Sequence, residues 1–380
     1  MIKSYKVRIY PTKEQEELMW KHIGSCRFIW NWMLAKQQEV HEQGGKHLSA
    51  FDMMKLLKPL KSEEEYGWLY DVSNTSLQKI CRDLNEAYKK FFKKIGGFPK
   101  FKSRKKSKPS FPIRAEVLYF KDDKFVNVEK IGKVRYRTDF TFSIGRNKTK
   151  FTNARISYIN GKWMLSFGIE RENQTPILTD KPMGIDLGIK ELAVVEYGGR
   201  QITFHNINKS KRMRFLNREL KRKQRTVSRK YEANRKGSKY VKTKNIEKVE
   251  SAIRKLYARI ANIRQDHLHK TTHELVSMLP ARVVMEDLNV SGMMKNKHLS
   301  KAISEQCLYE FIRQMKYKCE WLGIPFVQVD RFYPSSKTCS CCGSIKRNLK
   351  LSDRTYVCES CGAVIDRDYN AAVNLSRYIA

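Results

Sequence analysis

Hydrophobic and polar residues alternate over positions 3–10, and this pattern predicts a β-strand that Pro11 ends. Thr12 has the side chain of a helix N-cap, and beyond it apolar residues recur every three or four positions, as they do on one face of an amphipathic helix. The same spacing predicts two further helices, near residues 49–60 and 76–95. The chain is therefore expected to begin with one strand followed by a helical region.

Strand-like segments return between residues 113 and 171. An Asn-Gly pair at 160–161 predicts a tight hairpin turn between the last two of them. The predicted strands are 117–119, 124–128, 133–137, 154–159 and 163–169. We expect the N-terminal strand and this set to form one small β-barrel, with the helical region inserted between them.

Residues 183–195, MGIDLGIKELAVV, are an apolar run that contains one early acidic residue, Asp186. Such a run predicts a strand buried on both faces, followed by a second strand. Burying an unpaired carboxylate is costly, so Asp186 should be paired with a base, partly solvated or bound to a cation. Gly184 and Gly188 flank it, and glycine in a strand lets backbone, solvent or a ligand approach closely. A strand-end Asp that caps a turn explains this stretch alone equally well.

The remaining elements of the second half are strands and helices in a recognisable order. They are a strand at 201–204, a long helical stretch with an apolar stripe over 253–275, a strand at 282–288, a helix at 302–322, a strand at 324–329 and a final helix at 365–375. Together with the two strands around Asp186, this is the element order of a ribonuclease-H-like fold. The second half is therefore predicted to be an α/β domain.

Acidic residues stand at three places that such a fold can bring together. Asp186 lies in the mid-sheet strand, Glu286 and Asp287 end the neighbouring strand, and Asp366 and Asp368 begin the last helix. Three carboxylates around two Mg²⁺ ions would polarise a phosphodiester, activate a water and stabilise the leaving oxygen, as in two-metal nucleases. Either acid of the last helix is more simply explained as its N-cap, but that interpretation does not account for the set.

The chain contains 76 Lys and Arg residues against 39 Asp and Glu, a formal charge of +37. A charge of this size repels itself unless a polyanion neutralises it, so nucleic acid is the expected partner. A membrane-surface protein is the competing interpretation, but the basic residues are spread along the chain and neither end carries a lipidation motif. There is no apolar run of membrane-spanning length and no signal peptide at the start, so we expect a cytoplasmic protein without membrane association.

Two segments concentrate the basic residues. Residues 96–112 hold six Lys or Arg, no acidic residue and three phenylalanines, which favours a nucleic-acid contact over a solvated linker. Residues 209–248 hold 17 Lys and Arg against 3 Glu within the helical stretch, which favours a groove for a phosphate backbone. The candidate nucleic-acid contacts are Tyr5, Lys100, Lys102, Arg104, Lys105, Lys106, Arg218, Lys221, Arg222 and Arg225.

Four of the nine cysteines form two Cys-x-x-Cys pairs, separated by 15 residues and each followed by glycine. Four thiolates at this spacing predict a tetrahedral structural zinc site. The predicted ligands are Cys339, Cys342, Cys358 and Cys361, with Cys341 as a bystander. An odd cysteine count with this arrangement favours a reducing compartment over a disulfide framework.

Several blocks of the sequence resemble TnpB, the RNA-guided nuclease of insertion-sequence transposons, which is related to the compact type V CRISPR effectors. The blocks are KVRIYPTKEQEELM, FPKFKSRKKSKPSF, GIDLGIKELAVV, VVMEDLNV, YPSSKTCSCCG, YVCESCG and DRDYNAAVNL. The resemblance covers nearly the whole chain, and its C-terminal blocks are the most specific. It implies that Asp186, Glu286 and Asp368 form the acidic triad of a RuvC nuclease. The family's third acid lies two residues before Asn, here Asn370, and its second acid is a Glu after an apolar run.

The resemblance also implies an architecture with α/β, all-β and α-helical parts. In it, a ribonuclease-H-like RuvC nuclease domain with an inserted zinc ribbon follows a small β-barrel wedge domain that carries an inserted helical recognition domain. The implied boundaries are 1–11 and 112–178 for the wedge, 12–111 for the recognition domain, 179–333 and 364–380 for RuvC, and 334–363 for the ribbon.

The implied activity is Mg²⁺-dependent, RNA-guided cleavage of DNA. TnpB-like proteins bind a transposon-derived guide RNA, recognise a short motif beside the target, and pair the guide with one DNA strand. We expect a monomer in a ribonucleoprotein, with two catalytic Mg²⁺ ions and one structural Zn²⁺. The alternatives are an RNA-guided regulator that binds without cutting, and a strand-transferring transposase or its accessory protein. All three triad positions are acidic, which favours an active nuclease, and no tyrosine or serine nucleophile motif stands out.

Overall fold

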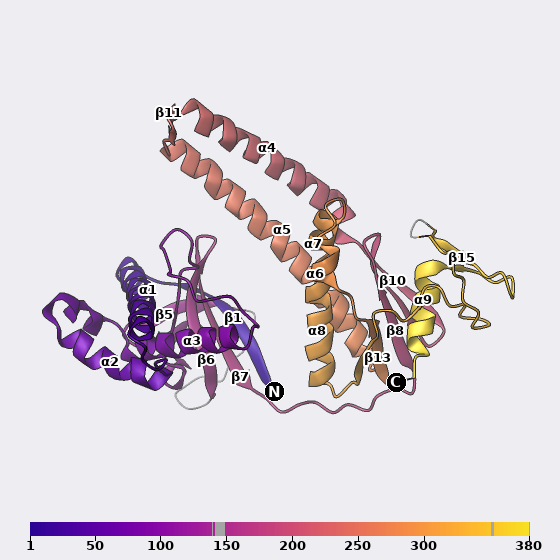
Figure 1. The fold of residues 1–380 in the computed structure, drawn as a ribbon, viewed down its shortest axis with the longest axis horizontal. Coiled ribbons are helices and arrows are strands. Elements are labelled where there is room, and N and C mark those ends of the chain that lie inside the picture. The colour runs from indigo at the N-terminus through magenta and orange to yellow at the C-terminus, as the bar shows by residue number, and fades with distance from the viewer. Residues whose placement is uncertain (139, 141–148, 351–352, 380) are drawn as a thin grey trace. The chain divides into compact units, whose positions relative to one another are not determined.

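The computed structural model describes residues 1–138, 140, 149–350 and 353–379, in two compact units, Met1–Glu172 and Asn173–Ala380 (Figure 1). Each unit combines a β-sheet with helices, so the mixed α/β character expected from the sequence is confirmed. Within the described ranges, no helix is both long enough and apolar enough to cross a membrane.

The first unit is built on one antiparallel sheet of seven strands. They are β1 (Ile2–Tyr10), β2 (Ser110–Pro112), β3 (Tyr119–Phe120), β4 (Phe125–Val128), β5 (Gly132–Arg137), β6 (Phe151–Ile159) and β7 (Lys162–Glu170), in the spatial order β2-β6-β7-β1-β5-β4-β3. Strand β1 pairs with β7 on one side and with β5 on the other, so the N-terminal strand does join the later strands. The strand pairs of the described residues run from β2 at one edge to β3 at the other, and none among them closes a barrel.

Helices fill the interval between β1 and β2, as the sequence predicts. They are α1 (Lys13–Glu42), α2 (Ala50–Ser62), the 3₁₀ helix η1 (Glu64–Asp71) and α3 (Asn74–Phe92). Thr12 and Gln15 form a capping box at the start of α1, because each side chain bonds the other residue's backbone N–H. The predicted strand at 117–119 is wrong in part: η2 (Ala115–Val117) precedes the short β3, and the amide of Leu118 closes this turn on Ala115.

The second unit contains a mixed sheet of five strands. They are β8 (Pro182–Leu187), β9 (Glu191–Tyr197), β10 (Arg200–His205), β13 (Arg282–Glu286) and β14 (Phe326–Val329), in the order β10-β9-β8-β13-β14. Strands β8, β13 and β14 are parallel, whereas β9 and β10 are antiparallel to their neighbours. Two short hairpins, β11–β12 (Arg235–Lys236 and Lys239–Tyr240) and β15–β16 (Thr355–Val357 and Val364–Asp366), lie outside this sheet.

Helices cover both faces of this sheet. The helices of the second unit are η3 (Ile207–Lys209), α4 (Lys211–Ala233), α5 (Lys244–Ser277), α6 (Val290–Met293), α7 (Ser300–Gln306), α8 (Leu308–Trp321) and α9 (Arg367–Ser376), of which α5, α8 and α9 pack on the sheet. One face packs Met183, Ile185, Val283 and Met285 against apolar residues of α5 and α8. On the other face α9 lies against β8, β9 and β13.

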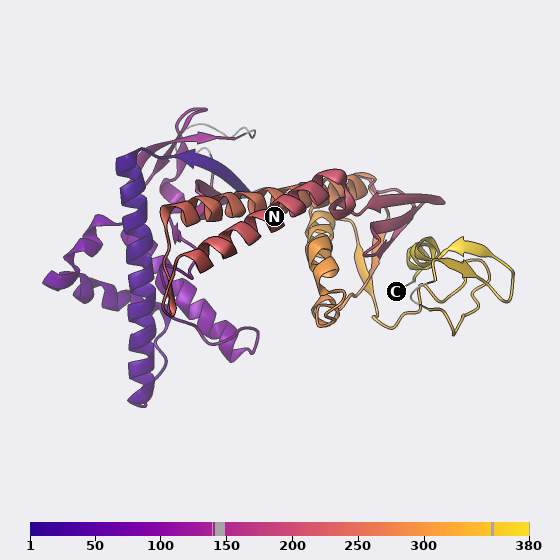
Figure 2. The same ribbon diagram turned by 90° about the horizontal axis from the view of Figure 1, so that it is seen from above.

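Two helical predictions for the second unit need correction. The long basic stretch is a hairpin of α4 and α5, joined through β11 and β12, and the two helices run side by side in both views (Figures 1 and 2). The predicted helix at 302–322 is two helices that meet at Cys307, whose φ of 57° lies in the left-handed region. The buried side chain of Gln306 donates hydrogen bonds to the carbonyls of Gly188 and Glu191, which fixes the end of α7 there.

Candidate active site and zinc site

The sheet of the second unit directs two predicted acids toward the same face. Side chains alternate along a strand, and Gly184 and Val284 lie on the face that α9 covers. Asp186 and Glu286 each lie two residues further along β8 and β13, so they share that face. The strands are parallel with Ile185 paired to Met285, which places the two acids at neighbouring positions. Both side chains are half-buried.

Gly184 lets α9 approach this face closely enough to add a third acid. A Cβ atom built on Gly184 would lie 2.0 Å from the carbonyl oxygen of Ala372 and 2.4 Å from the amide nitrogen of Ser376. Both are backbone atoms, so α9 rests directly on the backbone of β8 and any side chain here would push it away. The close approach that a glycine in this strand predicts is thus an approach of backbone.

Two aspartates begin α9, and the structure separates their roles. Asp366 is the N-cap, since its Oδ1 accepts hydrogen bonds of 3.0 Å from the amides of Asp368 and Tyr369. Asp368 lies in the first turn, half-buried, with Arg354 at 3.8 Å from its carboxylate. The structure therefore brings Asp368, with Glu286, into the electrostatic neighbourhood of Asp186.

The electrostatics of this cluster combine burial of Asp186 with repulsion from neighbouring carboxylates. Burial raises the pKa of Asp186 well above its usual value, and the carboxylates of Glu286 and Asp368 raise it further, while Arg367 opposes the rise. Facing carboxylates are the donor set that hard divalent cations such as Mg²⁺ prefer, and a cation would offset their mutual repulsion. The residues present therefore fit a divalent ion, although their oxygens are not gathered as tightly as the four cysteine sulfurs described below.

Glu286 has a buried partner that sequence reasoning missed. The hydroxyl of Ser335 donates a short hydrogen bond to its carboxylate, and Ser335 is only 2% exposed. Asn374 of α9 holds the Ser335 loop, because its side-chain amide donates to the carbonyls of Ser335 and Thr338, both at 2.7 Å. The adjacent Ser-Ser pair in the sequence gave no hint of this contact, since it depends on how the loop folds over β13.

Asp287, the neighbour of Glu286, has different surroundings. Its carboxylate accepts a 2.7 Å charge-assisted hydrogen bond from Arg331, and both side chains are 47% exposed. It is therefore a surface ion-pair residue.

The zinc-ligand prediction concerns a compact cluster at the C-terminal end of the chain. The sulfurs of Cys339, Cys342, Cys358 and Cys361 all lie within 4.8 Å of one another. Two of the sulfur pairs, Cys339 with Cys361 and Cys342 with Cys358, are 3.7 and 3.6 Å apart. Four sulfurs at about 2.3 Å from a central ion would lie about 3.8 Å apart, so the cluster has the dimensions of a zinc site. Cys341 is exposed and outside it.

Both halves of the cluster have the same turn geometry. The amide of Gly343 donates to the carbonyl of Cys339, and that of Gly362 donates to the carbonyl of Cys358. Both glycines have positive φ, 78° and 71°, which explains why glycine directly follows each pair. The hydroxyl of Ser344 also lowers the pKa of Cys358, to about 5, which favours the thiolate that binds metal.

Helix α9 connects this cluster to the acids. Asn370 is fully buried; its amide donates to the carbonyl of Thr338 at 2.7 Å, and its oxygen accepts from the amide of Ser340 at 2.9 Å. These two residues flank Cys339. The helix that positions Asp368 thus also holds the first half of the cysteine cluster.

The predicted nucleic-acid contacts have mixed surroundings. The ring of Tyr5 is a core group, 7% exposed and stacked on Phe167 with 5.9 Å between centroids, which counts against its predicted role. Lys102 is half-buried, with its ammonium 3.4 Å from the ring centroid of Trp30. The other candidates are exposed, on the 96–112 segment or on α4: Lys100, Arg104, Lys105, Lys106, Arg218, Lys221, Arg222 and Arg225.

Family models match three parts of the chain. A model described as "Helix-turn-helix domain" matches residues 1–46, one described as "Probable transposase" matches 166–297, and one described as "Cas12f1-like, TNB domain" matches 309–375. The second includes Asp186 and Glu286, and the third includes Asp368 and the four cysteines. The first covers a strand and one long helix in this structure.

Relatives span nearly the full chain. A Streptomyces pristinaespiralis protein named "Putative RNA-guided DNA endonuclease" is 32% identical, over 98% of this chain and 88% of its own. An Escherichia coli K12 protein named "Putative RNA-guided DNA endonuclease InsQ" is also 32% identical, over 98% of this chain and 91% of its own. Among solved structures, the mini-RNA-guided endonuclease CRISPR-Cas_phi3 aligns over 99% of this chain and 92% of its own, with 12% identity and a TM-score of 0.49, too low to assign a fold.

These matches define the class of protein: the chain belongs to the TnpB family, also called the IS605 OrfB family. The family resemblance that the sequence blocks indicate is thereby confirmed. More distant relatives carry the family's name, among them the TnpB-like protein L770 of Acanthamoeba polyphaga mimivirus, which is 24% identical over 98% of this chain.

Proposed function

We propose that this protein is an RNA-guided DNA endonuclease that binds a guide RNA and cuts the matching DNA by Mg²⁺-dependent hydrolysis. The observation that carries the proposal is the convergence of Asp186, Glu286 and Asp368 on the face of the sheet that α9 covers. The names of the full-length relatives point to the same activity. The charge of +37 fits two nucleic-acid partners.

In this proposal the three carboxylates hold two Mg²⁺ ions. Bound Mg²⁺ supplies Lewis-acid polarisation of the phosphodiester and activation of the attacking water. Asp186 would offer its carboxylate from strand β8, and the hydrogen bond from Ser335 would fix the direction of the Glu286 carboxylate. Asp366 holds the start of α9, and through it Asp368, by capping the helix.

The zinc ribbon has a structural part in this proposal. Zn²⁺ on the four thiolates would hold the cysteine cluster and the adjoining hairpin β15–β16, whose two short strands alone bury little apolar surface. Asn370 and Asn374 of α9 donate hydrogen bonds to the carbonyls of Thr338 and Ser335, so they would hold the Ser335 loop next to the zinc-bound segment. We also propose the four-part division into wedge, recognition, RuvC and ribbon segments, with a β-barrel-like fold for the wedge part and a ribonuclease-H-like fold for the RuvC part. The central position of β1 and the packing of α9 on β8 support it.

The test uses the protein co-expressed with RNA from its own locus. The copurified RNA is sequenced, and the complex is given a library of DNA with a matching target beside randomised flanks, with and without Mg²⁺. We expect cleavage that needs both the match and Mg²⁺ in the wild type, and none with Asp186→Asn. RNA-guided binding without any cut by either protein would indicate the regulator instead, and joined strands would indicate a transposase.

A further inference from the structure

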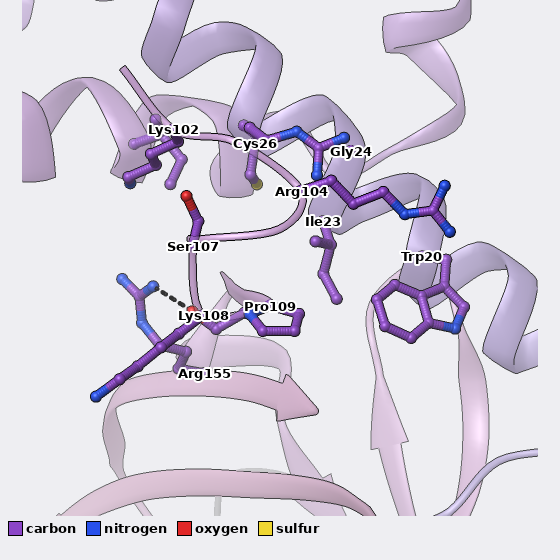
Figure 3. Close-up of a pocket in the computed structure, with 13 residues that line it drawn as sticks. Trp20, Ile23, Gly24, Cys26, Lys102, Arg104, Ser107, Lys108, Pro109 and Arg155 are labelled. Atoms are coloured by element: carbon purple, nitrogen blue, oxygen red, sulfur yellow. Dashed lines mark hydrogen bonds between the residues drawn. The ribbon is translucent and has the colours of Figure 1, made fainter. Parts of the chain in front are cut away.

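The first unit contains a pocket that the proposed nuclease site does not use. Its volume is about 640 Å³, which lies within the range of about 300–1,000 Å³ typical of ligand sites. Helix α1 forms one wall, through Ile23 and Gly24, and strand β6 forms the floor, through Arg155 (Figure 3). The strap, defined here as residues 100–109, arches over it. All of these elements belong to the first unit.

The strap is fixed to α1 by specific hydrogen bonds. The indole of Trp30 donates to the carbonyl of Lys100 at 3.0 Å. The side chain of Asn31 bonds both backbone groups of Lys102, donating to its carbonyl at 2.9 Å and accepting from its amide at 2.7 Å. A tight turn follows, in which Ser103 and Ser107 bond each other. The pocket therefore has a preformed wall on this side.

The lining of the pocket is strongly cationic. It includes Arg27, Lys102, Arg104, Lys108 and Arg155, and none of the described residues that line it is Asp or Glu. Burial lowers the pKa of Lys102 to about 8, although Asp83 opposes this shift. Asp83 itself pairs with Arg155 at 2.6 Å and does not line the pocket. Asp83 thus offsets charge at Arg155 and Lys102, two of the five cations, and the pocket is suited to an anion.

One aromatic ring of the lining is held in a fixed position. Trp20 is 39% exposed, and its ring meets those of Tyr158 and Trp163 edge to face, each with 5.1 Å between centroids. Its indole also donates to Glu16 at 3.3 Å. A supported, partly exposed indole beside a cationic pocket is suited to stack on a nucleobase.

Gly24 leaves space in the pocket wall. A Cβ atom built there would meet no atom within 4 Å, and Gly24 is a helical residue without an unusual φ. Nothing in the packing of α1 requires glycine at this position, and alanine or leucine would favour the helix more. The absent side chain keeps the pocket open.

We propose that this pocket binds a single unpaired nucleotide of a nucleic-acid strand, with its phosphate among the cations under the strap and its base toward Trp20. The proposal rests on the proposed function, because it assumes a guide RNA and a DNA target. Either strand has the required chemistry, so the test measures them separately.

Two variants test the pocket in the full-length protein. Gly24→Leu places a side chain in the part of the pocket that the base of the nucleotide would occupy. Lys102→Met removes a positive charge while keeping most of the volume of the side chain. The matched controls are Gly67→Leu, where a Cβ also meets nothing within 4 Å, and Lys55→Met, which removes a lysine that lies 4.8 Å from the ring of Phe51. Dissociation constants are measured for two binding steps: the copurified guide RNA with the protein, and matched DNA with the RNA-loaded protein. Each is measured at several salt concentrations from about 50 to about 300 mM, because contacts with phosphates weaken as salt rises.

Each pocket variant should weaken one of the two binding steps about tenfold, and each control less than about twofold. For Lys102→Met the slope of log affinity against log salt should become shallower by about 0.7 in the affected step. A weaker RNA step assigns the nucleotide to the guide, and a weaker DNA step assigns it to the target. Pocket variants that match their controls in both steps would overturn the proposal. If the wild type binds no RNA or DNA, it is the proposed function that fails.

Discussion

Replacing Gly184 with alanine should separate the acids without touching any of them. The added Cβ would lie 2.0 Å from the Ala372 carbonyl oxygen, whereas ordinary contact begins at 3.4 Å. Because the carbonyl oxygen that the Cβ meets belongs to the backbone of α9, the helix must retreat by about 1.4 Å, the difference between these distances. A misplacement of about 1 Å in a reacting group can cost roughly 100-fold in rate, so Asp368 should no longer support cleavage at more than about 1% of the wild-type rate.

The same substitution has a separate cost in stability. Overpacking of a tight contact typically costs about 1–3 kcal/mol, which corresponds to a fall in Tm of roughly 2–10 °C for a unit of this size. The assay combines single-turnover cleavage of matched DNA, guide-RNA binding and thermal unfolding. Gly67→Ala is the control, because its Cβ meets nothing. If Gly184→Ala cleaves within about twofold of the wild type, α9 does not hold Asp368 in the way described here.

Three further changes test other parts of the molecule. Ser335→Ala removes the hydroxyl that orients Glu286, and should lower the cleavage rate about tenfold with RNA-guided binding unchanged; equal loss of binding would contradict a positioning role. Cys358→Ser should lower the zinc content measured by atomic absorption from one ion per chain toward zero and make the ribbon the first site of proteolysis, whereas Cys341→Ser should retain the metal. Arg222→Gln, on the exposed face of α4, should weaken nucleic-acid binding to a similar degree for all sequences and make the salt slope shallower by about 0.7–0.9, and a sequence-selective loss would argue against a backbone contact.

The candidate acids and cysteines can be picked out of the sequence because the chemistry expected of them depends on short spacings. An isolated carboxylate in an apolar strand and two Cys-x-x-Cys-Gly repeats are local patterns, and the structure places them on a strand and in two matching turns. The family resemblance favours Asp368 over Asp366 from the sequence, and the structure adds a physical difference between them, because Asp366 is the residue that caps the helix.

Contacts between distant segments could not be predicted in this way. The contact of Ser335 with Glu286 joins residues 49 positions apart, and the break at Cys307 depends on Gln306 reaching Gly188 across 118 positions. The sequence pattern around Tyr5 is compatible both with an exposed side chain that contacts nucleic acid and with a core side chain. Its stacking on Phe167 shows that it is a core side chain. The density of basic residues predicts that Lys102 contacts nucleic acid. In the structure the strap is fixed to α1, and the ammonium of Lys102 lies over the ring of Trp30.

In the proposed function, Asp186, Glu286 and Asp368 act as one metal-binding unit. This is tested most directly by comparing the cleavage rates of Asp186→Asn, Glu286→Gln, Asp368→Asn and the triple variant, with Asp287→Asn as the control, in complexes that bind matched DNA equally well. Residues that act as a unit are strongly non-additive, so each single variant should lose nearly as much activity as the triple variant, and the control should retain it. Independent, additive losses, or a control as inactive as Glu286→Gln, would contradict the account.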